Sequence, residues 1–261
     1  MNDLLQAVLS KLDRGDGKED QWPDAKGEYW ALCPFHGDTH AGNFSVSAKG
    51  YKCFSCDAKG GLKALATHLG IAQGEIEAAT WPATLENYSK QKALPLDFLQ
   101  SLGLQNASYS GAKAFKMPYY DRGGVESAAR FRVALTGEDR FKWRSGSKTM
   151  PYGLWKLPAS GYVLLFEGES DSQTAWYHGL PALGIPGATN WKKEWAEYLE
   201  GLTVFVWQEP DKAGGGFVAK IGDSLPDALV ITPPVGRKDI SECHLLGDDI
   251  PALIDGLRMT A

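Results

Sequence analysis

The stretch from Cys33 to Cys56 begins with CPFH and ends with CFSC, and sixteen residues separate the two motifs. Each motif holds two metal-binding side chains two residues apart, so one tight turn can aim both at a single ion. Thiolates and imidazole at this spacing are typical of a tetrahedral zinc site. Three of the four cysteines in the chain fall here, which argues against a chance cluster. The predicted zinc ligands are Cys33, His36, Cys53 and Cys56, with His40 as a substitute for His36.

Short strand-like segments surround these ligand pairs. Alternating apolar residues predict a small antiparallel sheet, with a turn at Lys49-Gly50. A small antiparallel sheet that holds zinc is a zinc ribbon, and a unit of this size depends on its metal for stability. The expected elements are strands over 28–32, 44–46 and 51–54, and helices over 2–12 and 62–69. A polar stretch over 13–26 separates the first helix from the ribbon.

Composition places the chain among globular proteins of one large or two small domains, with 261 residues of which 43% are hydrophobic. The sequence contains no run of eighteen apolar residues and no basic-then-apolar start, so we expect neither a membrane span nor a secretion signal. Zinc-type cysteines with one left over, Cys243, fit a reducing cytoplasm better than a disulfide scaffold. We expect Cys243 to be an ordinary semi-buried residue.

Charge is unevenly distributed along the chain. The net charge is −5, yet residues 111–150 hold nine basic and four acidic side chains, which gives +5 there and −10 elsewhere. A basic stretch beside an acidic remainder indicates local phosphate binding. A solvated charged face is the alternative that the sequence leaves open.

The pattern changes along the second half of the chain. Strands are expected over 115–120 and 128–133, joined by a turn at 121–124. From Gly161 onward, apolar strands alternate with helical segments, which favours a parallel sheet covered by helices. The predicted strands are 162–166, 181–185, 203–207 and 228–231, and the predicted helices are 172–178, 192–199 and a segment ending near 224.

Acidic side chains follow three of these strands. Glu167 and Asp171 follow the first, Glu209 and Asp211 follow the third, and Asp239 comes shortly after the fourth. In parallel sheets, ligands gather at the carboxyl ends of the strands. Carboxylates that converge there repel one another unless a cation lies among them, and oxygen ligands select magnesium or manganese. A magnesium or manganese site is therefore expected at this edge of the sheet.

Two of these patterns together resemble a known family. The CPFH and CFSC motifs with their strands resemble the CHC2-type zinc ribbon of bacterial and phage replicative primases. Residues 167–171 (EGESD) and 209–214 (EPDKAG) resemble the two acidic motifs of the TOPRIM fold, which is shared with topoisomerases. The resemblance covers about residues 28–69 and 111–240. One departure is Glu209, because the second motif usually reads Asp-x-Asp.

The resemblance implies a mixed α+β and α/β chain, in which an N-terminal zinc ribbon precedes a primase catalytic core with a mostly parallel TOPRIM sheet. The implied division is a template-binding ribbon over 1–75, a connection over 76–95, a basic subdomain over 96–158 and a TOPRIM subdomain over 159–261. Without a Walker-type glycine-lysine loop, the chain is expected to be a compact primase without a helicase domain, from a phage or mobile element.

The implied function is that of a DNA primase. It would join ribonucleoside triphosphates into short RNA primers on single-stranded DNA by metal-dependent nucleotidyl transfer, with structural zinc and catalytic magnesium or manganese. By this resemblance Glu167, Glu209 and Asp211 hold magnesium, and Asp171 and Asp239 are additional catalytic residues. The implied template- or triphosphate-binding residues are Arg130, Arg132, Lys142, Arg144, Lys148, Lys212 and Lys238. Further candidate template contacts are Phe35, Lys52, Phe54 and Trp143, of which the aromatics equally suit a packed core.

Two other functions remain open from the sequence. One is a TOPRIM nuclease, which would cut the template without synthesis. The other is a catalytically silent nucleic-acid-binding module that recruits a helicase or competes with a host primase. A replicative helicase is an expected partner in either the primase or the recruiting role.

Overall fold

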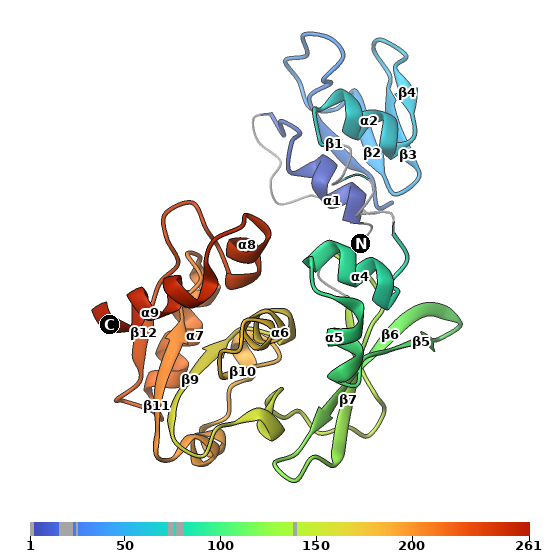
Figure 1. Cartoon of the computed structure of the whole chain (residues 1–261). Helices are drawn as coiled ribbons and strands as arrows, with labels where there is room; N and C mark the ends of the chain where they lie inside the picture. The colour runs from blue at the N-terminus through green and yellow to red at the C-terminus, as the bar shows by residue number, and fades with distance from the viewer. Residues whose placement is uncertain (1–2, 16–22, 25, 73–75, 77–80, 138–139) are drawn as a thin grey trace. The chain divides into compact units, whose positions relative to one another are not determined.

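The computed structural model describes residues 3–15, 23–24, 26–72, 76, 81–137 and 140–261. These residues form two compact units, one of residues 1–83 with 133–141 and one of residues 84–132 with 142–261. Each unit is considered by itself (Figure 1). Parts of the sequence predictions lie outside the described residues: Asn2 of the first helix, portions of the stretches 13–26 and 70–92, and Glu138 and Asp139 of the basic stretch.

The N-terminal unit is a small antiparallel sheet with two helices. The strands β1 (Tyr29–Ala31), β2 (Phe44–Ser47), β3 (Gly50–Cys53) and β4 (Lys59–Gly60) pair in chain order. Helices α1 (Asp3–Leu9) and α2 (Leu62–His68) pack on each other, and their apolar side chains close a core with those of the sheet. This arrangement confirms the expected zinc ribbon. Helix α1 ends at Leu9, three residues earlier than expected.

The second unit opens with two helices and an antiparallel sheet. Helices α4 (Leu85–Lys92) and α5 (Leu96–Ser101) precede a sheet in the order β5-β6-β7-β8. Its strands are β5 (Gln105–Tyr109), β6 (Ala112–Tyr120), β7 (Glu126–Arg132) and β8 (Phe141–Trp143).

Helix α4 lies within the segment that the sequence analysis assigned to a connection over 76–95. Its composition is polar, but the Thr84 side chain accepts a hydrogen bond from the Asn87 amide and so caps the helix. Leu85 and Tyr88 are buried and attach one face of α4 to the second unit. The division into 1–75, 76–95, 96–158 and 159–261 stays a prediction.

A four-stranded parallel sheet dominates the rest of the second unit, as the strand and helix alternation predicted. Its order is β10-β9-β11-β12, and each neighbouring pair is parallel. The strands are β9 (Gly161–Phe166), β10 (Ala182–Gly184), β11 (Leu202–Trp207) and β12 (Leu229–Ile231). An antiparallel bridge from Tyr152 to Gly184 extends the β10 side, next to the short helix η2 (Leu154–Lys156). The sheet has the mostly parallel character expected of a TOPRIM subdomain.

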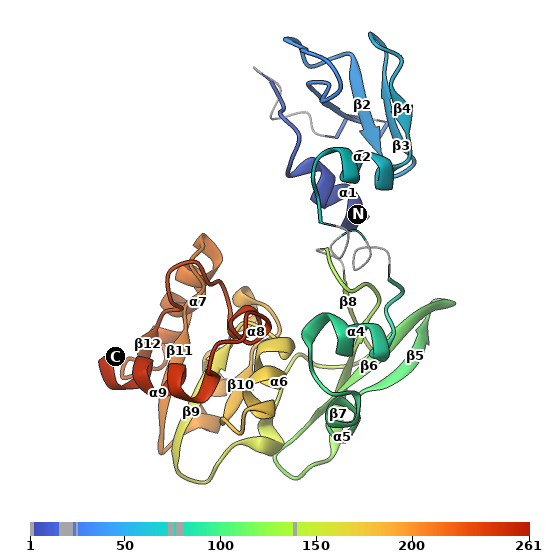
Figure 2. The same cartoon turned by 45° about the horizontal axis from the view of Figure 1, so that its top comes forward.

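Helices cover both faces of this sheet (Figures 1 and 2). On one face, Phe217 and Ile221 of α7 (Lys212–Gly222) pack with Val163 and Val204, beside η3 (Ala188–Asn190) and η4 (Lys193–Leu199). On the other face lie α6 (Glu169–Tyr177), α8 (Ile240–Leu245) and α9 (Ile250–Thr260). The guanidinium of Arg258 in α9 stacks over the rings of the strand residues Tyr162 and Phe205.

The expected helix over 192–199 is a 3-10 helix in the structure, and α8 and α9 were not predicted. Within the part of the chain that the structure describes, no helix combines the length and apolar character needed to cross a bilayer.

Candidate functional site

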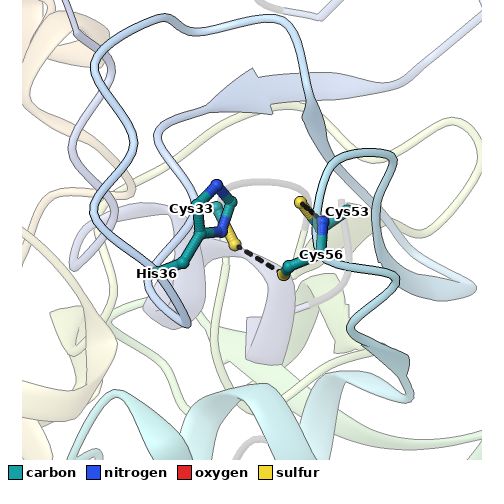
Figure 3. Close-up of side chains that lie close together, drawn as sticks. All are labelled: Cys33, His36, Cys53 and Cys56. Atoms are coloured by element: carbon teal, nitrogen blue, oxygen red, sulfur yellow. Dashed lines mark hydrogen bonds between the residues drawn. The ribbon is translucent and has the colours of Figure 1, made fainter.

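The four predicted zinc ligands converge in the N-terminal unit (Figure 3). Cys33, His36, Cys53 and Cys56 each offer a ligand atom, and these atoms lie within 4.8 Å of one another. The Cys33 and Cys56 sulfurs are 3.9 Å apart. Two sulfurs bound to one tetrahedral zinc at about 2.3 Å each would be separated by roughly 3.8 Å. His40 instead pairs its Nδ1 atom with the Thr39 hydroxyl and lies outside this group, so His36 is the fourth ligand candidate.

The environment of these ligands fits a zinc ion. The His36 Nδ1 atom is buried and has no hydrogen-bond partner among the described residues. Burial raises the pKa of the Cys33 thiol to about 12, and the neighbouring Cys53 and Cys56 sulfurs contribute to the rise. Burial also opposes ionisation of Cys53, but the amides of Cys56 and Ser55 donate to its sulfur and lower its pKa. Three thiolates and one imidazole fill all four positions of a tetrahedral ion and leave no open coordination position for chemistry, so zinc here would be structural.

The aromatic residues of the ribbon divide into core and surface. Phe35 stacks on His68 and on Tyr51, with 4.0 Å and 5.2 Å between the ring centroids, so it is part of the core. Phe54 is 56% exposed, stacks with Trp30 at 6.0 Å, and carries the Lys52 ammonium 4.5 Å above its ring. Trp30, Lys52 and Phe54 also line a surface cavity of about 550 Å³. We call these three residues the ribbon face.

The acidic side chains of the second unit meet at the carboxyl edge of the parallel sheet. Asp171, Glu209 and Asp239 place carboxylate oxygens within 4.8 Å of one another. Asp171 comes from the first turn of α6, Glu209 from the loop after β11, and Asp239 from the N-cap of α8. Glu167 and Asp211 lie outside this set of three. They are nevertheless close enough to interact with it, since the charges of Glu209 and Asp211 raise the pKa of Glu167.

The resemblance suggested Glu167, Glu209 and Asp211 as magnesium ligands. The structure instead groups Glu209 with Asp171 and Asp239. The Asp211 side chain accepts a hydrogen bond from the Gly214 amide at 2.9 Å and caps α7. Asp239 caps α8 in the same way and still belongs to the group, so capping does not separate the two acids. The assignment of Glu167 and Asp211 as metal ligands stays a prediction.

Burial and mutual repulsion perturb this carboxylate group. Burial raises the pKa of Asp171 to about 7, with Asp239 the next largest contributor. Burial and then the charges of Glu209 and Asp211 raise the pKa of Glu167, also to about 7. The Glu167 Oε1 atom is buried with no hydrogen-bond partner among the described residues. Oxygen ligands, mutual repulsion and an unsatisfied buried carboxylate oxygen together fit a divalent cation such as magnesium or manganese.

A lysine partly balances these acids. The Lys238 ammonium lies 3.1 Å from Glu209 Oε2 and 3.5 Å from Asp211 Oδ2. Lys238 and Glu209 also line a cavity of about 580 Å³, together with Pro210, Pro233 and Pro234. This cavity opens beside the carboxyl ends of β11 and β12, where ligands of parallel sheets bind.

Glu169, the second glutamate of the first acidic motif, forms a buried ion pair. Glu169 is 3% exposed and its Oε1 atom lies 2.6 Å from Arg130 Nη1. The Tyr119 hydroxyl donates to the same carboxylate oxygen. Since Arg130 and Tyr119 belong to the antiparallel sheet and Glu169 to α6, we call this group the clamp.

The clamp was not predicted from the sequence. A signal for it was present, because EGESD carries a second glutamate at the start of a helix whose polar Ser172, Gln173 and Thr174 are also buried. Gln173 accepts a hydrogen bond from the Tyr88 hydroxyl and donates one to the Tyr152 hydroxyl, which forms a second buried polar network next to the clamp.

The basic residues predicted to bind nucleic acid occupy different environments. Arg130 belongs to the clamp, and Arg132 is buried with its guanidinium over the Tyr88 ring. Arg144 pairs with Glu126, while Lys142 is half-buried. Exposed side chains occur at Lys148, Lys212 and Lys238. Trp143 packs against Tyr119 and Arg130, which favours a role in packing over stacking on a template base. The structure thus gives the two arginines of β7 structural contacts, and a role in nucleic-acid binding stays a prediction for all seven.

Comparison with known proteins places these features in a wider context. A family model for the CHC2 zinc finger matches residues 23–74. The Gene 57 protein of Mycobacterium phage D29 is 31% identical over 113 residues, which are 42% of this chain and 74% of that protein.

Solved primase structures share the fold. The primase fragment of the bacteriophage T7 primase-helicase protein superposes with a TM-score of 0.52 at 20% identity, over 87% of this chain and 97% of that one. The zinc-binding and RNA polymerase domains of Aquifex aeolicus primase superpose with a TM-score of 0.53 at 16% identity, over 97% of this chain and 83% of that one. The chain therefore belongs to the same family as the phage Gene 57 protein, and it joins a CHC2 zinc ribbon to the fold of bacterial and phage primases.

Proposed function

We propose that this protein is a DNA primase that synthesises short RNA primers on single-stranded DNA. The observation that carries the proposal is the acidic group formed by Asp171, Glu209 and Asp239 at the carboxyl edge of the parallel sheet. It occurs in a chain that also has a zinc ribbon and the primase fold. A metal-binding acidic edge is suited to phosphoryl chemistry, and the ribbon supplies a separate surface for a template.

Structural neighbours support the proposed substrates. A DnaG primase catalytic domain with a TM-score of 0.53 and 13% identity was solved bound to single-stranded DNA. Primase domains of bacteriophage T7, with a TM-score of 0.53 and 21% identity, were solved with an RNA/DNA hybrid and dTTP. We infer the same chemical classes here: a single-stranded DNA template and nucleoside triphosphates. A replicative helicase is a proposed partner, and the four free cysteines agree with action in the cytoplasm.

The proposed reaction is attack of the 3′-hydroxyl of one nucleotide on the α-phosphorus of the next. A new phosphorus–oxygen bond forms, the bond to the β-phosphate breaks, and pyrophosphate leaves. Asp171, Glu209 and Asp239 would hold magnesium or manganese, which when bound neutralises phosphate charge and polarises the phosphoryl group. Glu167 would accept the proton of the attacking hydroxyl, a role that suits a carboxylate whose pKa is raised to about 7.

Template binding is assigned to two surfaces. The ribbon face offers an exposed aromatic ring and an ammonium, which suit stacking of an unpaired base next to a phosphate. Lys148 and Lys212 are exposed and would contact phosphates of the template or the triphosphate. The contacts of lysine side chains with phosphates are electrostatic, so we expect template affinity to fall as the salt concentration rises.

The test is primer synthesis from labelled ribonucleoside triphosphates on single-stranded DNA with magnesium, comparing the native protein with Asp239→Asn. Asparagine caps a helix about as well as aspartate, so this variant keeps the start of α8 but removes one charge of the acidic group. We expect synthesis to fall by about 100-fold or more, as for loss of a preorganised electrostatic group. The matched control is Asp249→Asn, the same change at the N-cap of α9.

The assay also separates the alternatives. Labelled oligoribonucleotides that depend on template and metal would support a primase. Template cutting without synthesis would identify a nuclease, and DNA binding that survives loss of the acids, with no synthesis by the native protein, would identify a silent binding module. Full synthesis by Asp239→Asn would contradict the proposed metal site.

A further inference from the structure

Lys238 lies between two carboxylates and a neighbouring cavity. Its ammonium bridges Glu209 and Asp211 at 3.1 and 3.5 Å. Its side chain is nevertheless 56% exposed, and it borders the cavity of about 580 Å³ described above. The same ammonium can therefore reach either the carboxylates or a ligand in the cavity by a change of side-chain rotamer.

The backbone of Lys238 is hydrogen-bonded through both its carbonyl and its amide. The Trp207 indole donates to the Lys238 carbonyl at 3.3 Å, and the Lys238 amide donates to Glu242 Oε2 at 2.5 Å. The next residue, Asp239, caps α8 through the Glu242 amide at 2.7 Å. These contacts fix where the side chain starts, so movement of its ammonium needs no rearrangement of the loop.

We propose that Lys238 exchanges one anionic partner for another as the site is loaded. Without a divalent ion, the Lys238 ammonium neutralises Glu209 and Asp211. When a divalent ion is bound at the acidic group, the ammonium turns to the polyphosphate of a nucleotide bound in the neighbouring cavity. The inference rests on the proposed function, because it takes a divalent ion and a nucleoside triphosphate as the ligands. It adds that one side chain links the binding of the two.

The physical basis is competition between cations for the same oxygen atoms. An ammonium within about 3 to 4 Å of a carboxylate lowers the attraction of that carboxylate for a second cation. Once a divalent ion supplies the positive charge, the ammonium is repelled by it and attracted by phosphate oxygens, which are strong acceptors of charge-assisted hydrogen bonds. The lining of the cavity suits a nucleotide. Pro210, Pro233 and Pro234 offer apolar surface for the base, and the Lys238 ammonium lies beside them for the phosphates.

The inference predicts opposite changes in two affinities when the charge of Lys238 is removed. In Lys238→Gln, Mn²⁺ should bind roughly 1.5- to 5-fold more tightly, as expected when one partly exposed ion-pairing cation is lost. ATP with saturating Mg²⁺ should bind roughly 10-fold more weakly, since a charge-assisted contact to phosphate is lost. Lys238→Arg retains the charge and should leave Mn²⁺ affinity close to native. Lys193→Gln, an exposed lysine of η4, controls for the change in net charge.

The measurements use the full, zinc-loaded chain and need no synthesis. Free Mn²⁺ is titrated by electron paramagnetic resonance, and ATP binding is measured by calorimetry. Mn²⁺ affinity in Lys238→Gln that is equal to or weaker than native would overturn the inference alone, as would unchanged ATP affinity. If the native protein binds no Mn²⁺, or if Asp239→Asn leaves its Mn²⁺ affinity unchanged, the proposed function and this inference are both overturned.

Discussion

The clamp offers the sharpest quantitative test, because it gives Arg130 a structural role where the sequence suggested a template contact. Arg130→Met removes the guanidinium that lies 2.6 Å from Glu169, whose side chain is 3% exposed. The Tyr119 hydroxyl would then be the remaining clamp partner of that carboxylate. The change therefore leaves a buried charge without its counter-ion at the first turn of α6.

The expected cost follows from burial. Removing one partner of a buried ion pair costs about 3–5 kcal/mol. Since each 1.36 kcal/mol is a factor of ten in an equilibrium constant, the opening equilibrium of α6 should rise about 150- to 5,000-fold. Tyr119→Phe removes one hydrogen bond to a charged group and should cost less, about 1.5–3 kcal/mol.

The assay is amide hydrogen exchange of α6 peptides in the full, zinc-loaded chain, since exchange reports the free energy of local opening. The combined variant Arg130→Met, Glu169→Leu and Tyr119→Phe replaces the whole clamp by apolar groups and should recover most of the lost protection. Unchanged α6 protection in Arg130→Met, together with weaker template binding, would refute the structural role and restore Arg130 as a template contact.

Further outcomes follow from the zinc ligands, the ribbon face and the carboxylates. In Cys53→Ser we expect loss of zinc by elemental analysis and of template-directed synthesis, whereas Cys243→Ser should keep its zinc; full stoichiometry in the first variant would contradict the ribbon site. Phe54→Ala should weaken binding of a single-stranded oligonucleotide, measured by fluorescence anisotropy, by about 1–3 kcal/mol if a base stacks there, and unchanged affinity would remove that contact. Because the pKa values of Glu167 and Asp171 are raised to about 7 in the folded chain, against about 4 when unfolded, their contribution to stability is complete below pH 4 and is lost as the pH rises through 7. Thermal unfolding without magnesium, compared with the Glu167→Gln/Asp171→Asn double variant, should show this loss between pH 4 and 7, and a difference of opposite slope would contradict it.

Local spacing accounts for the parts of the site that the sequence predicted correctly. Two residues between ligands aim both side chains at one ion through a single turn, so Cys33, His36, Cys53 and Cys56 could be named without a fold. The apolar runs of β9 and β11 were long enough to identify, and the loops that follow them had to carry their acids to one edge of a parallel sheet. The parallel order of the strands confirmed that reasoning.

Side-chain direction and burial could not be read in the same way. Asp211 and Asp239 both cap helices, but only Asp239 also lies in the acidic group, and that difference depends on where each loop ends in the fold. Arg130 and Arg132 looked like phosphate contacts because charge is normally exposed, and only the packing of Glu169 and Tyr88 against them explains their burial. Helix α4 was missed because its stability comes from a cap and two buried residues rather than from an apolar stripe.

The sequence by itself determined which four side chains converge as candidate zinc ligands, the parallel sheet and the edge at which acids gather, because these depend on spacing and on the period of apolar residues. The tertiary structure alone decided which acids share a site, which arginines are clamped inside the protein and where the Lys238 ammonium lies. Those choices depend on contacts between segments far apart in the chain, such as Arg130 with Glu169 and Lys238 with Glu209. Such long-range pairings leave no periodic trace in the sequence, and packing and electrostatics select them only once the chain has folded.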